Sequence, residues 1–141
     1  MADPYDLQRF VDAQEPVIDR VLAELQQGRK TSHWMWFIFP QIRGLGRSPM
    51  AERFAVASLE EARAFLDHPI LGPRLRRCTA LVNAIKARPI DQILDPPDDL
   101  KFRSSMTLFA RAATENRVFV EALDAYFAGQ QDTATLALMK I

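Results

Sequence analysis

The sequence predicts one compact all-α domain spanning residues 1–141, an orthogonal or irregular bundle of about seven or eight helices. Apolar residues recur at intervals of three and four along most of the chain, which is the pattern of a helix with one buried face. No convincing strand alternation, internal repeat or linker interrupts that pattern. With 48% hydrophobic and 26% charged residues, the chain has the composition of an ordinary globular domain.

The first two helices are predicted on either side of Pro16. Asp3 places a capping carboxylate before Pro4 in a first turn, and apolar residues follow at helical spacing until Pro16 interrupts them. A second helix continues from Pro16 to Gly28, where glycine typically ends a helix. The apolar positions of the two helices are Leu7, Phe10, Val11, Val17, Ile18, Val21, Leu22 and Leu25.

The middle of the chain predicts two helices and a short helix before them. Ser48-Pro49 has the form of an N-cap and first turn. Ser58-Leu59-Glu60-Glu61 is a capping box, and the helix that it opens continues to His68-Pro69. Pro73 opens a longer helix that ends before Pro89. The apolar face of this longer helix comprises Leu75, Cys78, Leu81, Val82 and Ile85.

Three further helices complete the prediction. The run Asp95-Pro96-Pro97-Asp98-Asp99 indicates a turn and a helix start, with acidic residues at the positive end of the helix dipole. Asn116 is predicted to cap the next helix, which ends before Gly129, and Asp132 begins a last short one. The inward positions of these helices are Phe102, Met106, Phe109, Phe119, Leu123, Tyr126, Phe127, Leu136 and Met139.

Charge and cysteine content exclude several classes of protein. Eighteen Lys and Arg residues balance eighteen Asp and Glu residues, so no global field favours general nucleic-acid binding. The single Cys78 cannot form an internal disulfide, and no pattern of Cys and His indicates a metal, so we expect neither metal nor cofactor. The chain starts without a secretory signal, and its longest apolar run, 34–39, is far too short to span a membrane. These features predict a cytoplasmic protein and leave the oligomeric state open.

An acid-free stretch between Glu24 and Glu52 stands out in this otherwise neutral chain. The same stretch contains both tryptophans and three of the five glycines. Its basic side chains are Arg29, Lys30, His33, Arg43 and Arg47. Because these cations have no local acidic partner, the stretch is a candidate binding site for an anion.

Two features within this stretch favour a nucleotide-like ligand. Gly44 and Gly46 let the backbone approach a ligand closely, and free N–H groups of the helix after Ser48-Pro49 are expected to point out of the loop. Trp34, Trp36 and Phe39 could stack a planar ring while a neighbouring cation neutralises a phosphate.

Each of these features also has a structural interpretation. Aromatic residues in a continuous run are more often core than pocket wall, and a Gly-x-Gly motif alone is a weak signal. His33 is either a hydrogen-bonded residue at a helix end or a proton donor and acceptor in a site. The sequence leaves both alternatives open.

A second set of polar residues falls on the helix that follows Asp99. Lys101, Ser104 and Ser105 share one face at helical spacing, opposite the apolar stripe, and form a candidate oxyanion site or a nucleophile and base. The alternative is a solvated polar face, because no third group orients the serine. A separate basic face and the acids that follow it are expected to neutralise one another. The two sets are Arg74, Arg76, Arg77, Lys86 and Arg88, and Asp91, Asp95, Asp98 and Asp99.

Four segments give the chain its resemblance to one family. They are Lys30 to Gln41, Gly44-Leu45-Gly46 with Ser48, His68-Pro69 with Leu71-Gly72 and Arg74-Leu75, and Lys101 to Phe109. With them the chain resembles the domain-of-unknown-function family eighteen-ten, which is mainly helical and found largely in bacteria. The resemblance implies a fold and two signature segments, without an activity. The label calpastatin that some members carry does not fit, because calpastatin is disordered and this chain has clean helical periodicity.

The order of an early aromatic segment and a later Met or Lys-Phe helix is also similar to small helical N-glycosidases that act on riboflavin-pathway intermediates and ADP-ribose adducts. That similarity implies a carboxylate near the aromatic segment. This chain has none between Glu24 and Glu52, so the same mechanism requires a distant acid such as Asp98 or Asp99 to fold into the site.

The preferred hypothesis is a domain that binds a small anionic, nucleotide-like ligand, such as ADP-ribose or a related ribosyl compound. Its site is expected to join the Lys30–Ser48 and Lys101–Ser105 segments, which must then meet in space. The alternatives are a protein-interaction or structural module, and an N-glycosidase-like hydrolase. The candidate catalytic residues are His33, Lys101 and Ser105, and the candidate ligand-binding residues are Lys30, Ser32, Trp34, Trp36, Gln41, Gly44, Gly46, Arg47, Ser48 and Ser104.

Overall fold

The computed structural model describes residues 2–140, and within this range it contains ten α-helices and no strand. The all-α prediction is confirmed. The helices are α1 (Gln8–Gln14), α2 (Ile18–Gln26), α3 (Met35–Ile38), α4 (Pro49–Arg53), α5 (Leu59–Asp67), α6 (Leu71–Asn83), α7 (Ile90–Ile93), α8 (Asp98–Ala112), α9 (Arg117–Phe127) and α10 (Thr133–Met139). The two that the periodicity did not predict, α3 and α7, have four residues each, which is too short to show a helical repeat.

The start of α1 differs from the prediction. The helix begins at Gln8, so Pro4 lies outside it, and Asp6 has a positive φ of 51°. Asp3 nevertheless caps the helix from a distance, because its carboxylate accepts hydrogen bonds from the N–H groups of Leu7 (2.9 Å) and Gln8 (3.0 Å). These two backbone hydrogen bonds lower the pKa of the Asp3 carboxyl.

The capping box at α5 has a modified form. Ser58 Oγ accepts a hydrogen bond from the Glu61 N–H (3.1 Å), as predicted, but the Glu61 carboxylate accepts from the N–H of Ala57 (3.3 Å) rather than of Ser58. Asn116 also differs from the prediction, because its side chain donates to the Ala110 carbonyl (3.0 Å) and makes no cap hydrogen bond to α9.

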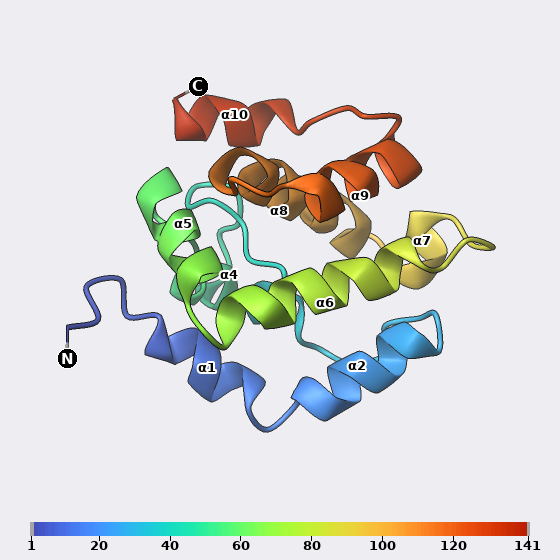
Figure 1. Cartoon of the computed structure of the whole chain (residues 1–141), viewed down its shortest axis with the longest axis horizontal. Coiled ribbons are helices and arrows are strands. Elements are labelled where there is room, and N and C mark those ends of the chain that lie inside the picture. Colours follow the sequence, from blue (N-terminus) through green and yellow to red (C-terminus); the bar gives the residue numbers. More distant parts are fainter. Residues whose placement is uncertain (1, 141) are drawn as a thin grey trace.

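Helix α6 crosses the middle of the molecule, with α1 and α2 on one side and α8, α9 and α10 on the other (Figure 1). Helix α8 packs against α5, α7, α9 and α10, so it is enclosed on several sides. No helix within residues 2–140 is long and apolar enough to cross a membrane.

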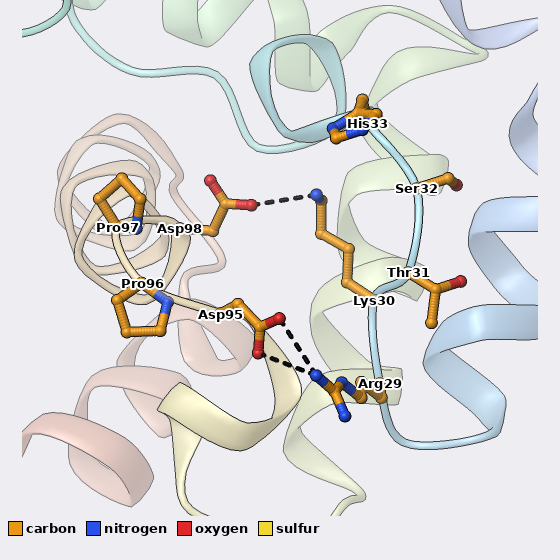
Figure 2. Close-up of a pocket in the computed structure, with 9 residues that line it drawn as sticks. All are labelled: Arg29, Lys30, Thr31, Ser32, His33, Asp95, Pro96, Pro97 and Asp98. Carbon is orange, nitrogen blue, oxygen red and sulfur yellow. Dashed lines mark hydrogen bonds and ion pairs between the residues drawn. The ribbon is translucent and has the colours of Figure 1, made fainter.

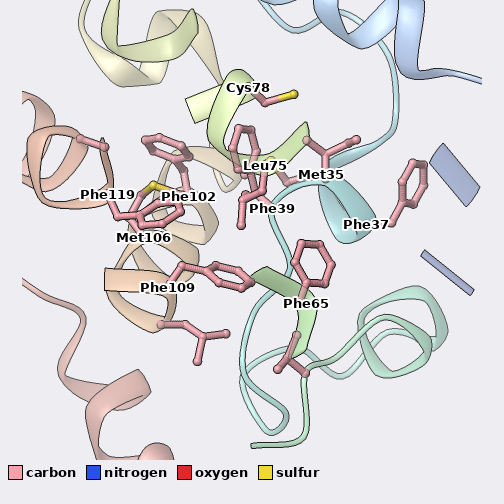
Figure 3. Packing of buried hydrophobic residues seen from close by; sticks show 14 of the residues in the cluster. Met35, Phe37, Phe39, Phe65, Leu75, Cys78, Phe102, Met106, Phe109 and Phe119 are labelled. Atoms are coloured by element: carbon pink, nitrogen blue, oxygen red, sulfur yellow. The ribbon is translucent and has the colours of Figure 1, made fainter. Parts of the chain in front are cut away.

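Aromatic side chains pair with one another in two groups within the hydrophobic core. Phe39 meets Phe102 edge to face, with ring centroids 5.0 Å apart, and Phe65 lies 5.4 Å from Phe109 (Figure 3). Most of the run at 34–39 is therefore buried in the core. For these residues the structural interpretation, core rather than pocket wall, is correct. Cys78 is also fully buried, and this burial raises the pKa of its thiol to about 12.

Candidate functional site

A pocket of about 380 Å³ lies where two segments distant in the sequence meet, and we call it the Lys30 pocket. One wall is the loop Arg29–His33, which connects α2 to α3, and the other is Asp95–Asp98, which leads into α8 (Figure 2). The volume falls in the range of small-molecule sites. The first wall includes the start of the predicted Lys30–Ser48 segment, whereas the second wall precedes the predicted Lys101–Ser105 segment, no residue of which lines the pocket.

Glu24 of α2 fixes the shape of the first wall. Its side chain accepts hydrogen bonds from the N–H groups of Thr31 (2.7 Å) and Ser32 (3.1 Å) and from Ser32 Oγ (2.5 Å). A fourth bond comes from the indole N–H of Trp34 (2.9 Å). The backbone N–H of Lys30 also donates a hydrogen bond to the Ile93 carbonyl of α7 (2.9 Å). The loop is therefore held to two helices through its backbone.

The Glu24 carboxylate is charged at neutral pH although it is only 7% exposed. Burial alone would raise the pKa of this carboxyl, but the hydrogen bonds from Ser32, Thr31 and Trp34 outweigh burial and lower the pKa to about 2. A buried charge held by four donors orients the loop more firmly than neutral groups would.

Ion pairs connect the two walls. Lys30 Nζ lies 3.0 Å from Asp98 Oδ2, with side chains only 10% and 18% exposed, and Lys101 Nζ lies 3.8 Å from the other oxygen of Asp98. Arg29 pairs with Asp95 at 3.2 Å, but both of these side chains are more than half exposed, so this pair contributes little to stability. The Lys30–Asp98 pair is the shielded contact between the walls.

The sequence predicted that the acidic residues of this region neutralise the basic face at 74–88. The ion pairs of the structure differ from this prediction. Asp95 and Asp98 pair with Arg29 and Lys30 instead. Arg74 finds its partner in Glu15 of the chain segment after α1, at 2.9 Å.

The structure places some of the predicted site residues at the Lys30 pocket. Lys30, Ser32 and His33 line it, and His33 is exposed. Ser32 points away from the space between the walls, toward Glu24 (Figure 2). Lys101 reaches the pocket edge through its contact with Asp98.

The alternative interpretation of this face of α8, a solvated polar face, is wrong for both serines. Ser104 is 7% exposed and donates to the Leu100 carbonyl (3.2 Å), whereas Ser105 is fully buried and its hydroxyl has no hydrogen-bond partner. Trp34, predicted to stack a ligand ring, is likewise only 1% exposed. Trp36 and Gln41 are half-buried, and neither lines the Lys30 pocket.

The glycine loop forms a separate hollow. Gly44, Gly46 and Arg47 line a space of about 490 Å³ that shares no residue with the Lys30 pocket, so the expected single site spanning Lys30–Ser48 is divided in two. Ser48 Oγ is already occupied as the cap of α4, where it accepts from the Ala51 N–H (3.1 Å).

Two important residues were absent from the predicted site. Glu24 had been noted only as the boundary of the acid-free stretch, although an acid beside Val21 and Leu25 on the apolar face of a helix is itself a signal of a buried polar contact. Asp98 was predicted at a helix start, among the acids that neutralise the basic face, and as the distant acid that a glycosidase-like mechanism requires; in the structure it lines the pocket. Within residues 2–140, no group of three or more His, Cys, Asp or Glu could hold a metal ion.

Ser105 offers a direct test of its environment. Replacing Ser105 by alanine is expected to leave stability unchanged or to raise the free energy of unfolding by up to about 1 kcal/mol, because a buried hydroxyl without a partner is removed. Ser104→Ala is the matched control and should lose a few tenths to about 1 kcal/mol with its hydrogen bond. Urea unfolding measures both. A loss above about 1 kcal/mol in Ser105→Ala would contradict the unpaired state of this hydroxyl.

The fold and the pocket define a small all-α protein with a polar cleft between a basic loop and an acidic helix start. Residues 4–139 match the sequence profile of the family described as "Protein of unknown function (DUF1810)", and the chain belongs to this family. It is similar to the crystal structure of the conserved hypothetical protein Rv1873 from Mycobacterium tuberculosis, with 57% sequence identity, a TM-score of 0.97 and 99% of each chain covered. No protein of curated function matches the chain.

Proposed function

We propose that the Lys30 pocket binds a small anionic, nucleotide-like ligand, such as ADP-ribose or a related ribosyl compound. The observation that carries this proposal is the shielded position of Lys30, which reaches across the pocket to Asp98. An ammonium group has three N–H donors, and Lys101 approaches the same carboxylate from the other side. Two cations therefore share one anion, which leaves positive charge for an incoming phosphate.

The remaining lining groups suit the sugar part of such a ligand. Asp95 offers carboxylate oxygens to ribosyl hydroxyls, and the exposed imidazole of His33 can donate or accept a hydrogen bond. Arg29 is exposed at the rim, where it can meet a second phosphate. Flat apolar contact would come from the rings of Pro96 and Pro97, because Trp34 is buried.

Isothermal titration calorimetry with ADP-ribose tests the proposal, with AMP and ribose 5-phosphate as smaller ligands. We expect wild-type protein to bind at least one of them, and Lys30→Gln to weaken that binding about tenfold or more, because a charge-assisted contact is lost. His33→Asn should weaken binding with little change in thermal stability, since this side chain is exposed.

Arg47→Gln is the matched control, because Arg47 is an exposed cation of the other hollow. It should leave the affinity unchanged. If Arg47→Gln weakens binding and Lys30→Gln does not, the ligand belongs to the glycine loop and the proposal is wrong. If none of the three compounds binds at millimolar concentration, the protein-interaction or structural alternative takes its place.

A second candidate function, N-glycosidase-like hydrolysis, is supported by one observation, the position of Asp98 in the pocket near the aromatic segment. In such a reaction water adds to the anomeric carbon as the bond to the base nitrogen breaks, and a proton goes to the departing base. Asp98 would orient the water and accept its proton. Chromatography of nucleosides that carry ADP-ribose on a base nitrogen, incubated with the protein, would show free ADP-ribose and the released nucleoside, and Asp98→Asn should abolish their release.

A further inference from the structure

A smaller hollow, of about 320 Å³, adjoins the Lys30 pocket, and we call it the Gln92 hollow. Arg29 and Asp95 line both spaces, so their ion pair (3.2 Å) lies where the two meet (Figure 2). The side chains of this pair are 56% and 59% exposed, so the pair opens at little cost in stability. A ligand in the Lys30 pocket therefore has room to extend past Arg29 into the Gln92 hollow.

The walls of the Gln92 hollow are joined through the backbone of the loop after α2. Arg88, in the loop after α6, donates from Nη1 to the Gly28 carbonyl (3.1 Å). The Lys30 N–H donates to the Ile93 carbonyl of α7 (2.9 Å). Hydrogen bonds thus hold this loop both to Arg88 and to α7, which carries Gln92, and the hollow belongs to the packed part of the fold.

Every lining residue of the Gln92 hollow has a polar side chain. Within the part of the chain that the structure describes, the five are Arg29, Arg88, Asp91, Gln92 and Asp95. Two cations balance two anions, so this lining has no net charge that would favour an ion of either sign. It also contains no aromatic or aliphatic side chain on which a nucleobase could stack. The ligand group that suits this lining is neutral and polar.

The available hydrogen-bonding groups include both donors and acceptors. Arg88 uses one N–H group on Gly28 and has further N–H groups, and Asp91 forms no ion pair with residues 2–140. Gln92 is exposed, and its amide can donate and accept. A hydroxyl group also donates and accepts, so the neighbouring hydroxyls of a sugar ring match this set. An ammonium group only donates, and an ionised phosphate only accepts, so each leaves half of the set unused.

We propose that the Gln92 hollow binds the terminal sugar of a ligand whose diphosphate lies against Lys30 and Arg29. This inference rests on the proposed function and specifies its ligand class as a nucleoside diphosphate joined to a sugar, rather than a mononucleotide. Gln92 and Asp91 determine this specificity, because neither lines the Lys30 pocket and both line the space beyond Arg29.

ADP is the comparison ligand that tests this inference, because it has the base, ribose and diphosphate of ADP-ribose but lacks the terminal sugar. By isothermal titration calorimetry, we expect ADP-ribose to bind about tenfold or more tightly than ADP. ADP carries more negative charge, so attraction to Lys30 and Arg29 alone would favour the opposite order. In two-dimensional NMR of ¹⁵N-labelled protein, ADP-ribose should shift the amide signals of Asp91 and Gln92, and ADP should not.

Gln92→Ala should weaken ADP-ribose binding about tenfold, to the affinity of ADP, and leave ADP binding unchanged. The exposed position of Gln92 spares the core. Asp91→Asn is the second variant and should show the same pattern, because a charged acceptor for sugar hydroxyls is lost. Gln26→Ala is the matched control, since Gln26 is an exposed glutamine of α2 outside both spaces, and it should change neither affinity.

Equal affinities of wild-type protein for ADP-ribose and ADP would overturn this inference and leave the proposed anion site standing. A preference for ADP-ribose that persists in both Gln92→Ala and Asp91→Asn would also overturn it, because the sugar then binds elsewhere. If neither ADP-ribose nor ADP binds, the inference is wrong, and the proposed function is wrong as well only if AMP and ribose 5-phosphate also fail to bind.

Discussion

Replacing Glu24 by alanine is expected to lower the free energy of unfolding by about 3 to 5 kcal/mol, one of the largest effects of any single substitution in this chain. The carboxylate accepts four hydrogen bonds, and the Trp34 indole that supplies one of them is only 1% exposed. Without Glu24, this N–H stays buried without an acceptor, and the loop at 29–33 loses its attachment to α2. Urea unfolding, with circular dichroism as the probe, measures the loss.

Glu24→Gln is the matched control, because the amide keeps the shape and one acceptor oxygen but removes the charge. We expect it to lose about half as much stability as alanine. Ligand binding at the Lys30 pocket should weaken in both variants, since the wall that carries Lys30 is no longer fixed. An alanine variant within about 1 kcal/mol of wild type would contradict the anchoring role of Glu24.

The charge of Glu24 also gives stability a pH dependence. The folded-state pKa of about 2 lies below the ordinary value of 4.5, so the charged carboxylate stabilises the folded state at pH values above about 4.5. This contribution, on the order of 2 to 4 kcal/mol, declines as the pH falls from 4.5 toward 2. The difference in unfolding free energy between wild type and Glu24→Gln should therefore shrink over the same interval. A difference that stays constant would show that Glu24 does not carry the charge.

The sequence predicted those helices whose apolar faces are long enough to show a period. In α8, the predicted stripe of Phe102, Met106 and Phe109 is fully buried. The same helix shows why the rest was missed. Its serines were predicted to lie on a polar face that either contacts a ligand or faces solvent. Helix α8 is enclosed by its neighbours, however, and Ser104 can be buried because its hydroxyl donates to the carbonyl four residues earlier. Hydropathy alone does not distinguish such a serine from an exposed one.

The candidate site was predictable in part for a related reason. The absence of acids near Lys30 predicted an anion site, and the similarity to N-glycosidases required a distant acid such as Asp98 or Asp99 in that site; in the structure Asp98 pairs with Lys30. Which acid pairs with Lys30 depends on how the segment before α8 packs against the loop at 29–33. No local sequence pattern predicts that packing. Gly44 was predicted in the same site because glycine lets the backbone approach a ligand closely. In the structure a side chain at Gly44 would instead meet Leu138 of α10.

Gly72 is one of the residues that give the chain its resemblance to the family, and the structure explains why a glycine stands there. It lies in the first turn of α6, directly after the corner with α5, where His68 Nδ1 accepts hydrogen bonds from the N–H groups of Ile70 (3.1 Å) and Leu71 (3.3 Å). A Cβ atom built on Gly72 would lie 2.0 Å from the carbonyl oxygen of Leu66 and 2.9 Å from its carbonyl carbon. Both contacts are with backbone, so no side-chain rotation can relieve them.

Gly72→Ala is therefore expected to lower the free energy of unfolding by about 3 kcal/mol or more, because the ends of α5 and α6 must separate. Within a helix, glycine to alanine ordinarily gains about 0.5 to 1 kcal/mol, so the expected sign here is opposite to the helix propensity. Ala80→Gly, at an exposed position of the same helix, is the control for propensity and should lose about 1 kcal/mol. Thermal and urea unfolding of both variants decide the matter. If Gly72→Ala is as stable as wild type, the close approach between α5 and α6 does not constrain this position, and the glycine needs another explanation.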